Sequence, residues 1–327
     1  MSRWPAIVAG AAAGAAVALA GCTGSGPGSA GSSVPPPHTS PALTSPRAAP
    51  PPASGTPGGT ATAYLSSSAP VSFTGDVVAL RVQASPRTGA QQWERLASAT
   101  VSLGDGATAT VDGRCTGAAL PPASAGLVIR HAYQRPGVVS PQLTAAAVCG
   151  LSGQPDLAQG PPLRVLPAAP AASASWPTCS PSQIGISAAG TGAGLGHVGV
   201  LFTLRNTSHA NCRLNGYPAL LLIGSNGQPL PTTVVRASTG AYLFPAVMPH
   251  WVALAPGAVA SFDLEYGDNP VGAQANVPYA QACPSAASAR VTLPNAATHS
   301  VVPVSMAPCG GRVLVSPVVP GSQWLSQ

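Results

Sequence analysis

Short apolar runs separated by turn residues recur through most of this 327-residue sequence, and they constrain the fold more than any other feature. Residues 77–82 (VVALRV) and 198–204 (VGVLFTL) have strand composition, and residues 259–266 alternate between apolar and polar side chains. Turn residues punctuate the runs, for example at 104–106 (GDG). Because the runs are short and show no helical period, they predict an all-β chain made of antiparallel sheets.

Two shifts in composition divide the chain into domains and connecting segments. Residues 22–69 consist of Pro, Ser, Gly, Thr and Ala with almost no large apolar side chains, so they cannot bury enough apolar surface to offset the entropy of ordering. We predict a disordered tether there and a short linker at 168–175. The other predicted segments are a β-sandwich at 70–167, a second β-sandwich at 176–320 and a C-terminal tail at 321–327.

Residues 1–21 have the pattern of an export signal. Arg3 is followed by an uncharged apolar stretch that ends at residues 19–22 (LAGC), which resembles the lipobox of bacterial lipoproteins. In that class the cysteine thiol takes a diacylglyceryl group, and the chain is cut just before it. The resemblance predicts lipidation of Cys22 and a protein held by this lipid on the outer face of the cytoplasmic membrane, extending into the cell wall. The alternative is an ordinary signal peptide or membrane span in which Cys22 is incidental.

Six further cysteines remain in the exported part of the chain, and an even number predicts disulfide bonds there. None lies in a Cys-x-x-Cys pair, which is the spacing typical of zinc sites. Six cysteines allow fifteen connectivities. The predicted domain boundaries favour three pairs, which are Cys115 with Cys149, Cys179 with Cys212, and Cys283 with Cys309. The first pair is the safest because its domain holds no other cysteine, whereas the pairing of the four C-terminal cysteines stays open.

Two motifs in the first predicted domain resemble the PKD family, an immunoglobulin-like β-sandwich. They are residues 101–106 (VSLGDG) and residues 131–137 (HAYQRPG), the second followed by an apolar run. In that family the His and Tyr help to hold the two sheets together and the Asp orders the turn, which implies these roles for His131, Tyr133 and Asp105. The sequence departs from the family in having aliphatic residues before the turn, where aromatic residues are usual, and a cysteine-bearing insertion between the motifs.

The second predicted domain closely resembles an actinobacterial family known as domain of unknown function 4232. The matching features are spread along its whole length. They are Cys179, the Asn-Thr step at 206–207, residues 212–218 (CRLNGYP), the turn at 254–257 (LAPG), Cys283, the Leu-Pro step at 293–294 and residues 309–311 (CGG). The family occurs in secreted proteins and lipoproteins and has no assigned activity. The resemblance therefore implies a second immunoglobulin-like antiparallel sandwich outside the cytoplasm, but no chemistry.

Few side chains are available for catalysis or metal binding. Charged residues make up 7% of the chain, the formal net charge is +6, and no basic cluster alternates with aromatic residues, so nucleic-acid binding is not expected. The sequence lacks a Gly-x-Ser-x-Gly motif, and most of its histidines, including His197 and His250, are isolated near predicted loops. We interpret the strand face shared by Asp263 and Glu265 as a solvated edge instead of a glycosidase pair. We expect no enzyme activity, no cofactor and no bound metal.

The most apolar connection expected on the surface runs from Tyr242 through Phe244 to Trp251. We interpret it either as a binding patch or, as the favoured alternative, as side chains that cap the sandwich core. The sequence predicts a non-catalytic binding or adhesion module that is attached to the membrane by its N-terminal lipid and faces cell-wall polymer or another envelope protein. An accessory domain of an envelope enzyme, a weak hydrolase and a purely structural wall spacer are the alternatives.

Overall fold

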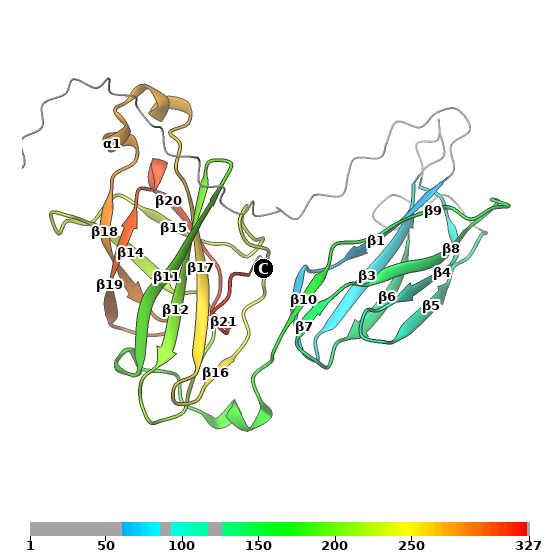
Figure 1. The fold of residues 1–327 in the computed structure, drawn as a ribbon, viewed down its shortest axis with the longest axis horizontal. Helices are drawn as coiled ribbons and strands as arrows, with labels where there is room; N and C mark the ends of the chain where they lie inside the picture. The colour runs from blue at the N-terminus through cyan, green and yellow to red at the C-terminus, as the bar shows by residue number, and fades with distance from the viewer. Residues whose placement is uncertain (1–60, 86–92, 117–125, 326–327) are drawn as a thin grey trace, which may run out of the picture. The chain divides into compact units, whose positions relative to one another are not determined.

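The computed structural model describes residues 61–85, 93–116 and 126–325, whose strands form two sandwiches (Figure 1). Cys22 and residues 23–60 lie outside these ranges, so the lipidation and most of the tether stay predictions. Strands dominate the described ranges, and the all-β prediction is confirmed. The helical segments there are short: η1 (Ala171–Ser175), η2 (Pro181–Gln183), η3 (Gly272–Asn276), α1 (Tyr279–Ala282) and η4 (Cys309–Gly311). No helix in these ranges has the length and apolar character that a membrane crossing requires.

The first sandwich is built from strands β1 to β10, which form three sheets with the orders β6-β3-β1-β9, β2-β10-β7 and β5-β4-β8. Alternate side chains point into a shared core, as in β3, where Val78, Leu80 and Val82 are buried between more exposed neighbours. The strands are β1 (Thr62–Ser67), β2 (Val71–Phe73), β3 (Val77–Ala84), β4 (Leu96–Ser102), β5 (Thr108–Asp112), β6 (Leu127–Ala132), β7 (Gly137–Val139), β8 (Gln142–Val148), β9 (Asp156–Ala158) and β10 (Leu163–Leu166).

The first sandwich begins earlier than the sequence predicted. Strand β1 lies inside the segment 22–69 that was expected to be tether, and it pairs antiparallel with β3 and parallel with β9. Ala63 and Leu65 are buried in the core. The strand was missed because Thr, Ala and Ser fill four of its six positions, so its composition continues that of the preceding segment. The predicted start of the sandwich at residue 70 is therefore corrected to include β1.

The PKD-like motifs make the contacts that the resemblance implies. Asp105 orders its turn by accepting a hydrogen bond from the Ala107 N–H at 3.1 Å, and its other oxygen lies 2.7 Å from His131 Nε2. This hydrogen bond with His131 lowers the pKa of Asp105. The buried Tyr133 hydroxyl donates to the Leu103 carbonyl at 3.0 Å, and burial raises the pKa of Tyr133 to about 12. These contacts connect β6 and the residue that follows it to the turn after β4.

The second sandwich is built from strands β11 to β21. Its largest sheet has the order β11-β12-β17-β20-β15, with β21 also paired to β17, and β13-β16 and β14-β18-β19 form two smaller sheets (Figure 1). Phe202, Leu222, Phe262 and Val291 lie in the common core. The strands are β11 (Ile184–Gly194), β12 (His197–Asn206), β13 (Cys212–Leu214), β14 (Ala219–Gly224), β15 (Thr233–Arg236), β16 (Val252–Leu254), β17 (Val259–Gly267), β18 (Ala286–Thr292), β19 (His299–Met306), β20 (Arg312–Val315) and β21 (Val319–Pro320).

Three disulfide bonds join the cysteines in the favoured pairs. Cys115 bonds to Cys149 in the first sandwich, and in the second sandwich Cys179 bonds to Cys212 and Cys283 to Cys309. The pairing that the sequence left open for the four C-terminal cysteines is thereby settled. Each bond closes a loop of roughly 30 residues, which is worth about 2–4 kcal/mol of stability.

Strand β17 is buried on both faces, which the sequence did not predict. One face packs into the core, while Asp263 and Glu265 on the other face are each 1% exposed. The segment 237–247 donates hydrogen bonds to Glu265 on this second face, and the C-terminal Leu325 donates one to Asp263. The interpretation as a solvated edge is therefore wrong, because alternation separates two faces but does not show whether a distant segment covers the polar one. The predicted C-terminal tail is likewise part of the folded unit as far as Leu325, which is buried.

Candidate functional site

A buried carboxylate near the end of β17 ties together two segments of the second sandwich. The Glu265 side chain is 2% exposed. Its Oε1 accepts hydrogen bonds from His197 Nδ1 at 2.9 Å and from the Tyr242 N–H at 3.2 Å, and Oε2 accepts one from the Leu243 N–H at 2.5 Å. A carboxylate held away from water is costly unless donors of this kind satisfy it. The donors come from β12 and from the segment 237–247, so Glu265 fixes these two segments against each other.

Two partly exposed rings lie next to this carboxylate. The His197 side chain is 39% exposed and Tyr242 is 40% exposed, and their rings stack with centroids 4.7 Å apart and an angle of 23° between the planes. Because a carboxylate only accepts, Nδ1 of His197 carries the hydrogen of this contact, and Nε2 is an acceptor whenever the imidazole is neutral. We call His197, Tyr242 and Glu265 the His–Tyr platform. It combines a partly exposed aromatic surface with an imidazole in a fixed orientation.

Two glycines on the β11–β12 hairpin make room for this arrangement. Gly196 has φ +83°, and a Cβ there would lie 2.9 Å from the Asn269 amide nitrogen, so the turn fits closely against the residues that follow β17. Gly199 pairs with Glu265 in the ladder between β12 and β17. A Cβ on Gly199 would lie 3.1 Å from the Trp324 ring and 3.2 Å from the Leu243 side chain. The missing side chain therefore leaves space for the two groups that cover the Glu265 face.

The structure separates the three residues of the predicted binding patch. Tyr242 is partly exposed in the His–Tyr platform. Phe244 is 2% exposed and belongs to a hydrophobic cluster with residues of both sandwiches, including Phe73 and Leu166, so it is buried but lies outside the core cluster of the second sandwich. Trp251 is 39% exposed, and the Arg213 guanidinium lies 4.0 Å from the centroid of its ring. Tyr242 is thus the residue of the predicted patch that lies in the platform.

Sequence reasoning missed the two partners of Tyr242. The sequence analysis interpreted His197 as an isolated residue near a predicted loop and assigned Glu265 to a solvated strand face. They are 68 residues apart in the sequence and meet because β12 and β17 pair antiparallel. The alternation of 259–266 placed the two carboxylates on one strand face, and carboxylates on a buried face need partners. Nothing local in the sequence specified which residues those partners were.

The side chains of the His–Tyr platform are suited to binding a ligand. Imidazole paired with a carboxylate also occurs in nucleophilic triads, where the histidine contacts a serine or cysteine. In the described ranges, His197 hydrogen bonds to Glu265. The same ranges contain no group of three or more His, Cys, Asp or Glu side chains arranged to hold a metal ion. What the geometry does supply is an aromatic face and one oriented nitrogen, which suit a ligand with an apolar face and a hydrogen-bond donor.

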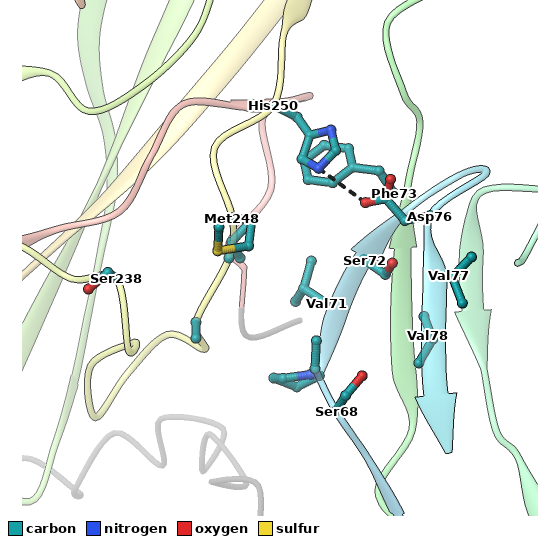
Figure 2. Close-up of a pocket in the computed structure, with 14 residues that line it drawn as sticks. Ser68, Val71, Ser72, Phe73, Asp76, Val77, Val78, Ser238, Met248 and His250 are labelled. Carbon is teal, nitrogen blue, oxygen red and sulfur yellow. Dashed lines mark ion pairs between the residues drawn. The ribbon is translucent and has the colours of Figure 1, made fainter. Parts of the chain in front are cut away.

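A groove of about 370 Å³ provides a second accessible surface (Figure 2). Its walls come from residues 68–78 and from residues 238–250, and Met248 and Val77 are exposed at it. His250 stacks on Phe73 with ring centroids 4.0 Å apart, and its Nε2 lies 3.1 Å from Asp76 Oδ2. Asp76 and His250 are the titratable side chains among the lining residues. The rest of the lining is apolar or carries serine hydroxyls.

Comparison with known proteins finds a family match for the second sandwich but assigns no activity. Residues 179–324 match the family described as "Domain of unknown function (DUF4232)", as the sequence resemblance predicted. No curated protein matches the chain. Among solved structures, the D0-D1 domain of intimin is 10% identical with a TM-score of 0.21, over 74% of this chain and 97% of that one. The Yersinia pseudotuberculosis adhesin InvE is 13% identical with a TM-score of 0.17, over 63% of this chain and 55% of that one. Because both TM-scores are below 0.5, neither likeness supports an inference about function.

Proposed function

We propose that this protein is a lipid-anchored, non-catalytic binding module of the cell envelope, and that the His–Tyr platform binds cell-wall polymer. The observation that carries the proposal is the buried Glu265, whose three hydrogen bonds hold the exposed rings of His197 and Tyr242. Burying a carboxylate costs free energy, because the carboxylate loses its hydration. In this protein the buried Glu265 holds two rings in a fixed position. A surface that is preorganised in this way loses less conformational entropy when it binds a ligand.

The chemistry of the platform favours a saccharide ligand. A sugar ring has an apolar face of C–H groups and a rim of hydroxyl groups. The Tyr242 ring offers an aromatic surface for the apolar face, and Nε2 of His197 can accept a hydrogen bond from a hydroxyl. Wall polymers are rich in such rings. The alternative occupant is another envelope protein, whose apolar side chains would use the same surface.

Location supports the same proposal. The sequence of residues 19–22 predicts a lipid on Cys22, and the three disulfide bonds fit an oxidising compartment. Changing Cys22→Ala should release the protein from the membrane fraction. Continued retention of this variant in membranes would contradict the lipid anchor.

The binding test is co-sedimentation of the lipid-free chain, residues 23–327, with purified cell-wall polymer at low and high salt. We expect binding that survives high salt, since attraction between scattered charges is screened there. Tyr242→Ala should weaken binding. Trp251→Ala is the matched control, because this aromatic side chain is exposed to the same degree but lies outside the platform. No sedimentation of wild-type protein would reject wall polymer as the ligand, and crosslinking from position 242 in intact cells would then identify a protein partner.

A further inference from the structure

The C-terminal end of the described chain packs on the face of β17 that carries the platform carboxylate. We call residues 321–325 the C-terminal strap. The Leu325 N–H donates a hydrogen bond to Asp263 Oδ2 at 2.9 Å, and Leu325 itself is buried. The Trp324 ring lies against Gly199, in the space left by the missing side chain. The strap is therefore attached to the sheet by one hydrogen bond to a carboxylate and by one large ring.

A cation on β10 holds the strap from its other side. Arg164 donates to the Trp324 carbonyl and, at 2.8 Å, to Gln323 Oε1. Arg164 also attracts Asp263 electrostatically, which opposes the lowering of the pKa of Arg164 by burial. The strap thus lies between a guanidinium from the first sandwich and a carboxylate from the second.

Asp263, the carboxylate that binds the C-terminal strap, is almost completely buried. It is 1% exposed, and among the described residues its Oδ1 has no hydrogen-bond partner. Burial raises the pKa of Asp263 to about 7, against the opposing effects of the Leu325 N–H and of Arg164. Glu265 lies two residues along β17 on the same face, with His197 bonded to it. The charged group that acts on Asp263 is therefore Arg164 from β10, and the nearest titratable groups along its own face are Glu265 and the His197 bonded to Glu265.

The neutral groups around Asp263 do not satisfy its second oxygen. The Ser316 hydroxyl accepts a hydrogen bond from the Asp263 N–H at 2.9 Å and donates to the Pro317 carbonyl at 2.9 Å, so it is already engaged with the backbone. A buried carboxylate with one unpaired oxygen is costly when ionised and less so when protonated. Hydration of that oxygen would lower the cost of ionisation.

We propose that Asp263 is a proton-dependent latch for the C-terminal strap, and that the strap in turn holds the Tyr242 segment of the platform in its binding geometry. Protonation favours the closed strap, because the neutral acid tolerates burial. Ionisation favours release, because the carboxylate gains hydration. The bound strap is therefore most stable at low pH and loses stability as the pH rises toward about 7.

The strap and the platform share contacts through Leu243. Its side chain meets the same Gly199 site as the Trp324 ring, and its N–H is one of the three donors to Glu265. Release of Trp324 removes the neighbour that confines Leu243 on this face. Tyr242 precedes Leu243 directly, so its ring loses its fixed position when that segment loosens. This second part of the inference rests on the proposed function of the platform, whereas the latch itself does not.

The latch is tested without any ligand, by amide hydrogen exchange at residues 323–325 in the lipid-free chain. Protection factors, corrected for intrinsic exchange, are measured from pH 5 to pH 8.5. We expect protection to fall by up to tenfold per pH unit below about 7 and to level off above it, since one proton is released on opening. Asp263→Asn should give high protection that does not vary with pH. Asp105→Asn, an exposed carboxylate in the first sandwich, is the control and should keep the wild-type profile.

A flat wild-type profile overturns the latch even if Asp263→Asn fails to fold. An unchanged profile in a folded Asp263→Asn protein overturns it as well.

Coupling between the strap and the platform is measured separately, as co-sedimentation with wall polymer at pH 5.5 and pH 7.5. Weaker binding at pH 7.5 in wild type but not in Asp263→Asn supports the coupling, and equal pH dependence in both contradicts it. If no polymer binds at either pH while protection follows the expected course, the latch stands and the proposed function fails.

Discussion

Each sandwich contains a histidine–carboxylate pair, and the two pairs differ in burial. His131 Nε2 lies 2.7 Å from Asp105 in the first sandwich, and His197 Nδ1 lies 2.9 Å from Glu265 in the second. The Asp105 side chain is 30% exposed and closes a single turn, whereas Glu265 is 2% exposed and collects donors from two segments. A buried acceptor must be satisfied by protein donors, so it orders the segments that supply them. Burial, more than the pair itself, gives the second pair its organising role.

The carboxylates of the two sandwiches should respond oppositely to pH. Burial raises the pKa of Asp263 to about 7 from an ordinary value of 3.8, so its contribution to stability is present below about pH 4 and is lost as the pH rises to about 7. The loss amounts to at most ~4 kcal/mol. The pKa of Asp105 is lowered, so its contribution is lost only as the pH falls below its ordinary range. Denaturant unfolding of Asp263→Asn from pH 4 to pH 8 should therefore show a flatter profile than wild type. An identical profile would contradict the assignment.

Removing the two pair carboxylates should have unequal effects on stability. Glu265→Ala leaves the buried N–H groups of Tyr242 and Leu243 without an acceptor, and we expect a loss of roughly 2–4 kcal/mol in the free energy of unfolding. Asp105→Ala removes a solvent-screened pair, and we expect a loss of less than about 1 kcal/mol. Thermal melts of the two variants check this difference. Equal losses would show that burial does not distinguish the pairs.

The two histidines should separate binding from folding. His197→Ala removes a ring from the platform, and we expect wall-polymer binding to weaken by about tenfold, or ~1.4 kcal/mol. His131→Ala removes a contact that orders the Asp105 turn and should leave the affinity unchanged. Both affinities are measured by co-sedimentation at fixed pH and salt. A loss of affinity in His131→Ala that matches the loss in His197→Ala would place the binding site elsewhere.

The smallest expected effect is at Trp251. Trp251→Ala loses its contact with the Arg213 guanidinium, which is worth about 0.5–1 kcal/mol at an exposed site. The melting temperature should fall slightly, and polymer binding should not change. A loss of binding in a folded Trp251→Ala protein would restore the patch predicted from the sequence and count against the platform.

The sequence predicted the fold well because the fold is encoded locally. Short strands, turn residues and the PKD-like motifs around Asp105 and Tyr133 could be identified from the sequence. The predicted domain boundaries favoured the cysteine pairs that form but left the pairing of the four C-terminal cysteines open. Strand β1 was missed because small residues give little periodic signal. The candidate site was predicted only through Tyr242, since the contact of His197 with Glu265 depends on which strands pair. The burial of Asp263 depends on where the last residues of the chain pack, which no local pattern specifies.

The most direct test of the platform compares the two histidine pairs in one experiment. The lipid-free chain is labelled at histidine, and the ring resonances of His197 and His131 are followed by NMR while soluble fragments of wall polymer are added. We predict a saturable shift at His197 and no shift at His131. Shifts at neither ring, or equal shifts at both, would contradict the claim that the buried Glu265 orients a binding surface.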